Sequence, residues 1–132
     1  MPYYFEFDPE NRILRGRFEG AVSDELLKEF YGVAGGYFER AGACVGLIDF
    51  SAVTSFEVSP QTIRDLASLP PAILDRDLPR FIVAPSPPIF GMARMFELGG
   101  QDTRPNLHVV RTIKEVCVIL GITYPKFEPI PP

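Results

Sequence analysis

Hydroxyl side chains occupy the positions where helices are expected to begin. Ser23 precedes two acidic residues and Ser59 precedes a proline, and both are helix-start patterns. Ser86 and Thr112 stand at two further expected helix starts. Because the N-terminus of a helix attracts anions, these residues could hold a phosphate or a carboxylate. A hydroxyl at such a position more often caps its own helix, so we expect capping at each position taken singly.

Two side chains could take part in acid–base chemistry. Asp49 lies near the end of an apolar run, where a carboxylate could act as a general base, ligate magnesium or brace loop N–H groups. The sequence pairs no second catalytic group with it, so we expect a brace. His108 is the only histidine. It lies between two apolar residues in an expected strand, which favours a structural or solvent-facing role.

The two cysteines, Cys44 and Cys117, each sit inside an apolar run. No Cys-x-x-Cys or Cys/His spacing occurs, so the sequence indicates neither a zinc framework nor a redox motif. We expect both thiols to be buried and inert. These observations predict a chain that is not an enzyme and has no catalytic residue, metal or cofactor.

The segment from Ile89 to Leu98 predicts a helix that is apolar around too much of its circumference for an ordinary surface helix. Ile89, Phe90, Ala93, Phe96 and Gly100 fall on its inward stripe, and Met92 and Met95 fall largely outside it. Two alternatives stay open. Either another element, such as the C-terminal tail or a second copy, covers this helix, or it presents a face for a ligand or partner.

Alternating and continuous apolar runs predict the elements that carry these residues. Residues 3–7 and 12–18 read as a hairpin, and residues 43–50, 78–84 and 106–110 read as further strands. A helix is expected after each strand from the second onward. The order β-β-α-β-α-β-α-β-α predicts an α/β domain over residues 1–122. It has a five-stranded mixed sheet, whose first strand is antiparallel and whose other strands are largely parallel, and about four helices. Residues 123–132 form a proline-rich tail, which we expect to be irregular.

Charge and hydropathy exclude two classes of partner. The net charge of −4 argues against nucleic acid, whose recognition needs a basic patch. The longest apolar run, residues 116–120, is far shorter than the roughly 20 residues of a membrane span. The N-terminus has no basic and apolar leader pattern, so a cytoplasmic location is the expectation.

Three stretches resemble the STAS-like family, which includes the anti-sigma-factor antagonists and uncharacterised stand-alone bacterial relatives. They are residues 47–54, residues 82–85 with 90–96, and residues 108–112 with Glu115. The resemblance implies the α/β fold given above and a role in protein–protein interaction. In the antagonists a serine that begins the second helix is phosphorylated, and Ser59 aligns with it. Glu57 keeps the acidic position of that motif, whereas Val58 and Pro60 differ from it.

Ligands of open α/β sheets bind at the carboxyl ends of the strands. We therefore expect a non-enzymatic binding or regulatory module. The first interpretation is a protein-interaction module or homodimer that uses the third-helix face, with phosphorylation at Ser59. The alternative is a carrier or sensor of a small apolar, lipid-like ligand between that helix and the strand-end loops. The candidate binding residues are Phe56, Glu57, Ser59, Ser86, Phe90, Gly91, Met92, Arg94 and Met95.

Overall fold

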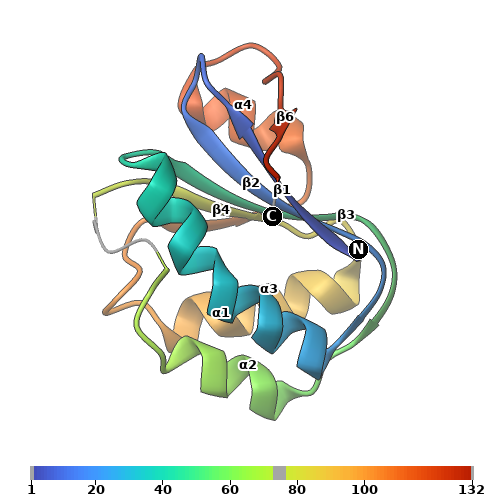
Figure 1. Ribbon diagram of the computed structural model, residues 1–132. Helices are drawn as coiled ribbons and strands as arrows, with labels where there is room; N and C mark the ends of the chain where they lie inside the picture. Colours follow the sequence, from blue (N-terminus) through green and yellow to red (C-terminus); the bar gives the residue numbers. More distant parts are fainter. Residues whose placement is uncertain (1, 73–76, 132) are drawn as a thin grey trace.

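A six-stranded mixed sheet forms the centre of the molecule (Figure 1). The computed structural model describes residues 2–72 and 77–131. The strands are β1 (Tyr3–Asp8), β2 (Ile13–Ser23), β3 (Val45–Glu57), β4 (Arg80–Val83), β5 (Leu107–Val110) and β6 (Glu128–Pro129). The helices are α1 (Asp24–Ala41), α2 (Pro60–Ala67), α3 (Pro87–Gly99) and α4 (Ile113–Leu120). None of the helices within the described ranges is long and apolar enough to cross a bilayer.

The strand order, β5-β4-β3-β2-β1-β6, decides where the helices lie. β1 and β2 form an antiparallel hairpin, and β2, β3, β4 and β5 run parallel to one another. The connections β2–α1–β3, β3–α2–β4 and β4–α3–β5 each lead to the next strand on the same side, towards the β5 edge of the sheet. Because such crossovers are almost always right-handed, their helices cover one face of the sheet. Figure 1 shows α1, α2 and α3 on that face and α4 on the other. The α/β class and the expected antiparallel first strand are confirmed.

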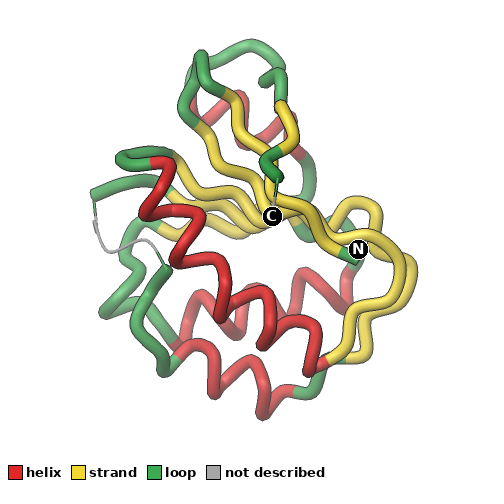
Figure 2. Tube along the Cα trace, viewed as in Figure 1, coloured by secondary structure: helices red, strands yellow, loops and turns green. Residues whose placement is uncertain are grey.

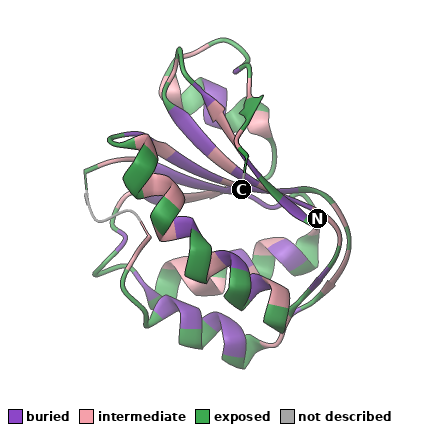
Figure 3. Ribbon diagram, viewed as in Figure 1, coloured by how far each residue is buried: buried purple, intermediate pink, exposed green. Residues whose placement is uncertain are grey.

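Each face of the sheet has its own hydrophobic core. Alternate residues of the strands point to opposite faces, so Leu14 and Phe18 pack beneath the three helices while Ile13 packs beneath α4. Phenylalanine rings fill much of the larger core, where Phe18 lies 4.7 Å from Phe30 and 5.1 Å from Phe50, measured between ring centroids. Figure 3 shows the buried residues along the strands and on the inner sides of the helices.

The second and third strands are longer than the sequence predicts. We expected Gly20 to close the second strand and Phe50 to end the third, but they continue, paired in parallel, to Ser23 and Glu57. β4 pairs only with residues 46–49 of β3, so the rest of β2 and β3 forms a two-stranded ribbon that curls towards the helices (Figure 2). Its polar sequence favoured a loop. The ribbon nevertheless buries Val22, and this tertiary contact overrides the local pattern.

The C-terminal tail is not wholly irregular, because it adds a sixth strand. Glu128 and Pro129 pair with β1, and the Ile130 N–H donates to the Phe5 carbonyl at 2.9 Å. A proline is tolerated there because β6 is an edge strand. The tail lies at the β1 edge, whereas α3 packs on α2, β3 and β5. The alternative in which the tail covers the third helix is therefore wrong.

Candidate functional site

Three of the four helix-start hydroxyls cap their own helices, as expected. Ser23 Oγ accepts the Leu26 N–H at 3.2 Å, and Ser59 Oγ accepts the Thr62 N–H at 3.3 Å. Thr112 forms a capping box with Glu115. Ser86 differs, since its side chain makes no cap bond. Two prolines open α3, which removes two N–H groups that an anion would need.

Carboxylates of the chain itself already occupy two of these helix starts. Asp24 accepts the Ser59 N–H at 2.7 Å, and this bond, with others from Thr62 and Ser59, holds the Asp24 pKa below its usual value. Glu115 accepts the N–H groups of Arg111 and Thr112 at 2.6 and 2.9 Å, which likewise lowers the pKa of its carboxyl. Carboxylates of the chain itself, Asp24 and Glu115, thus accept the backbone N–H groups at the starts of α2 and α4.

Asp49 acts as the expected brace. It is 5% exposed, and its carboxylate accepts the Ser51 N–H at 2.9 Å and the Ser51 hydroxyl at 2.5 Å. Its other oxygen lies 3.4 Å from the Arg15 guanidinium, which also pairs with Glu6 at 2.8 Å. Arg17 joins the same network through Glu6 at 3.1 Å. Both Asp49 oxygens are therefore engaged by neighbouring groups.

The other reactive side chains take structural positions. His108 is half-buried on β5, and its ring stacks on Phe81 at 5.3 Å between centroids. Cys44 and Cys117 are buried free thiols, and burial raises the pKa of both, which makes the reactive thiolate scarcer. Across residues 2–72 and 77–131, no three His, Cys, Asp or Glu side chains gather in a group that could hold a metal.

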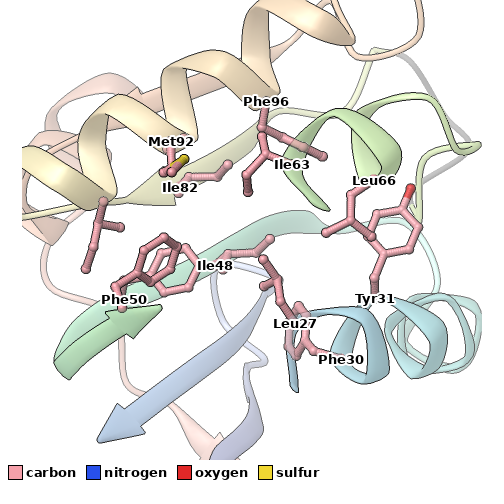
Figure 4. A pocket seen from close by; sticks show the side chains of 13 residues that line it. Leu27, Phe30, Tyr31, Ile48, Phe50, Ile63, Leu66, Ile82, Met92 and Phe96 are labelled. Carbon is pink, nitrogen blue, oxygen red and sulfur yellow. The ribbon is translucent and has the colours of Figure 1, made fainter. Parts of the chain in front are cut away.

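The predicted third-helix residues divide between two faces. Met92 is half-buried and points inward to the larger core (Figure 4), so its expected position outside the inward stripe is wrong. Gly91, Arg94 and Met95 line a groove on the outer side of α3, and Met95 also packs against the edge of the larger core. Phe90, at the start of the helix, carries the Arg111 guanidinium over its ring at 4.2 Å from the centroid. Successive residues of a helix are 100° apart, and this spacing identifies the buried side only when polar residues mark the opposite side. Because α3 is apolar around most of its circumference, the sequence could not show which side Met92 faces.

An apolar cavity lies under α3, between the three helices and the sheet (Figure 4). Its volume is about 60 Å³. Phe56, one of the predicted site residues, lines it and meets Phe50 edge-to-face at 5.6 Å. Glu57, its neighbour in sequence, is exposed and lies outside the lining. The cavity is lined by Leu27, Phe30, Tyr31, Ile48, Phe50, Phe56, Ile63, Leu66, Ile82, Ile89, Met92, Ala93 and Phe96.

A second cavity of about 70 Å³ adjoins the first and continues towards the C-terminal half of α1. The two share five lining residues, which are Phe30, Tyr31, Ile48, Ile82 and Phe96. The second cavity differs in having charged side chains, Arg80 and Arg104, in its lining. The pair therefore runs from an entirely apolar end under the start of α3 to an end that contains arginine.

A groove opens on the outside of the molecule between α2 and α3. Its walls contain Gly91, Arg94 and Met95 from α3, Arg64 and Ala67 from α2, and the α2 C-cap Ser68. Leu98, which is 57% exposed, extends the apolar strip at its end. The groove thus combines an apolar floor with two arginines.

Arg104 is the residue that the sequence analysis missed. It is 4% exposed and donates to the Tyr31 hydroxyl at 2.6 Å. It follows α3 in a segment without apolar periodicity, so no pattern marks it as buried.

No protein-family model matches the chain, and no curated protein or solved structure matches it significantly. The resemblance to STAS-like proteins stays an expectation.

Proposed function

We propose that the chain is a binding module for a small apolar ligand that is held beneath α3. The observation that carries this proposal is the pair of adjoining cavities on the helix-covered face of the sheet. Of the two functions expected from the sequence, this is the alternative one. It has the better support because a cavity lies beneath the third helix, which is one of the two elements between which the ligand was expected to bind.

Empty volume in a protein core is costly. Removing side-chain atoms from a packed core costs about 24 cal/mol per Å³ of cavity, so each of these cavities costs roughly 1–2 kcal/mol. A ligand that fills them recovers lost dispersion contacts. Apolar cavities of about 150 Å³ stay dry and bind benzene. Each cavity alone is smaller than that, whereas the volumes of the two together approach the size of a compact ligand of about six carbon atoms.

The wall of the cavity includes a side chain suited to moving aside. Met92 is unbranched and has a polarizable thioether, so it can adopt several rotamers at low cost. It projects from α3 into the first cavity, opposite Phe50 and Ile48 of β3 (Figure 4). We assign to Met92 the role of adapting the cavity to its ligand.

Thermal unfolding with added benzene tests the proposal. A ligand that binds only the folded chain stabilises it by about 2.7 kcal/mol when its concentration is 100 times the Kd. We expect benzene to raise the melting temperature of the wild type but not of Ala93→Leu, which fills the first cavity from α3. Met95→Leu, on the outer side of the same helix, is the matched control and should respond like the wild type. If benzene leaves the wild type unchanged, the proposal fails.

A second candidate function, protein–protein interaction through the third helix, is favoured by the groove between α2 and α3. Arg64 at its wall suits a partner segment with acidic residues, whereas Arg94 already pairs with Glu97, and Leu98 and Met95 offer apolar contact. A glutamate at position 98 would repel such a segment. Leu98→Glu should therefore abolish binding of an acidic partner segment while leaving benzene binding intact. If the partner segment binds the variant as well as it binds the wild type, the groove is not its binding site.

A further inference from the structure

Arg104 is a buried cation that is held by neutral groups. Nη1 donates to the Ala67 carbonyl at 3.0 Å, and Nη2 donates to the Leu69 carbonyl at 3.0 Å and to the Tyr31 hydroxyl at 2.6 Å. The guanidinium also lies 4.7 Å from the centroid of the Phe96 ring. Among the described residues, no carboxylate lies within 4.0 Å of it.

These contacts explain where the guanidinium sits but compensate only part of its charge. Ala67 is the last residue of α2, so Arg104 closes the C-terminal end of that helix. The C-terminus of a helix carries about half a negative charge, whereas arginine carries a full positive one. Arginine is seldom buried unless an anion pairs with it. A further negative group beside Arg104 would neutralise the rest of the guanidinium charge.

The guanidinium also keeps one donor available. All of its hydrogen bonds run through Nη1 and Nη2, and within the described part of the chain no acceptor meets the Nε–H. Arg104 lines the second cavity, together with Phe96 and Tyr31, which line both. The second cavity thus brings a cation next to the apolar side chains that the two cavities share.

We propose that the ligand is a small monocarboxylate of about six carbon atoms in all, with its apolar carbons in the first cavity and its carboxylate beside Arg104 in the second. This inference rests on the proposed function and adds the chemical class of the ligand. The apolar body takes the end lined by Phe56, Ile89 and Met92, where no charged side chain contributes to the lining. The carboxylate provides the charge that the neutral partners of Arg104 lack.

The test compares hexanoate with 1-hexanol at pH 7, where the acid is ionised. The two probes have the same chain length and differ in the charged head. We expect isothermal titration to show hexanoate binding at least fivefold more tightly than hexanol. We also expect the Arg104 guanidinium resonances to shift with hexanoate and not with hexanol.

The outcomes separate the two proposals. Equal affinity for acid and alcohol would overturn the carboxylate inference and leave the apolar cavity as a binding site. Binding of neither probe, together with no response to benzene, would overturn both. Binding of neither probe while benzene binds would overturn the carboxylate inference alone.

Variants locate the head group. Arg104→Met should remove the preference for hexanoate while hexanol still binds, and Arg64→Met, an exposed arginine of α2, is the matched control that should keep the preference. If Arg104→Met does not fold, Arg104→Gln gives the same information, because it removes the charge and keeps an N–H donor for the carbonyl groups that Arg104 meets. A preference for hexanoate that survives Arg104→Met, or Arg104→Gln where that variant replaces it, would overturn the assignment.

Discussion

The carboxylate of Asp24 accepts a hydrogen bond from the backbone N–H of Ser59 at 2.7 Å. Asp24 is the first residue of α1, and Ser59 is the N-cap of α2, so one side chain joins the starts of two helices. Negative charge at a helix N-terminus is stabilising. The position that an external anion would take at α2 therefore already holds an anion of the chain.

This bond predicts a pH-dependent contribution to stability. The Ser59 N–H, with smaller effects of neighbouring hydroxyls, lowers the folded-state pKa of Asp24. A lowered pKa means that the stabilisation is present above the unfolded-state pKa, about 3.9, and is lost as the pH falls through the folded value. Asp24→Asn should thus unfold at lower urea than the wild type at pH 7, and the difference should narrow at pH 3. Asp65→Asn, at an exposed site on α2, is the control, and a constant Asp24→Asn difference would contradict the account.

The same geometry predicts how Ser59 responds to substitution. Ser59→Ala removes the cap and should cost about 1 kcal/mol in urea unfolding. Ser59→Glu also places a second carboxylate beside Asp24, so it should cost more than the alanine variant. Because a phosphate would meet the same repulsion, we infer that phosphorylation of Ser59 would destabilise the start of α2. A glutamate variant as stable as the wild type would support the phosphorylation expected from the family resemblance.

Met92 and Met95 should respond differently to the same change. Met92→Glu brings a carboxylate into an apolar cavity and should cost more than about 3 kcal/mol. Met95 is half-buried at the edge of the larger core and lines the outer groove, so Met95→Glu should cost less than Met92→Glu, about 1–2 kcal/mol. Urea midpoints of the two variants measure the contrast. Equal midpoints would mean that the two side chains share one environment.

Asp49→Asn should lower stability by about 1–3 kcal/mol, because it removes the charge that faces Arg15 in a buried network. Ser51→Ala, which removes only the hydroxyl bond to Asp49, should cost less. Both effects are read from urea unfolding. An Asp49→Asn variant that unfolds like the wild type would show that Glu6 alone satisfies Arg15.

Local signals in the sequence predicted much of this fold. The Ser-Pro pair at residue 59 and the capping box at Thr112 mark helix starts because they act within a single turn. The ribbon from Ser51 to Glu57 could not be predicted, because its strand pairing depends on contacts with distant residues. The α/β class follows from the order of the helices and strands alone, and this order is the same whether or not the strand ends are predicted correctly.

The candidate site was predicted in part. Phe56 and Met92 line the first cavity, and Met95 lines the groove. The cavities themselves are gaps between packed elements, which no residue pattern encodes. Arg104 escaped notice because its partners, the carbonyl groups that end α2, are backbone atoms 35 to 38 residues away.

The most direct test of a ligand beneath α3 is a methyl NMR titration of the wild-type chain with benzene. Met92, Ile63 and Ile89 line the first cavity, whereas Ile13 is fully buried in the core on the other face of the sheet. The account predicts saturable shifts of the Met92, Ile63 and Ile89 methyl resonances and no shift of the Ile13 resonances. Unchanged resonances of the cavity methyl groups, or equal shifts at Ile13, would contradict it.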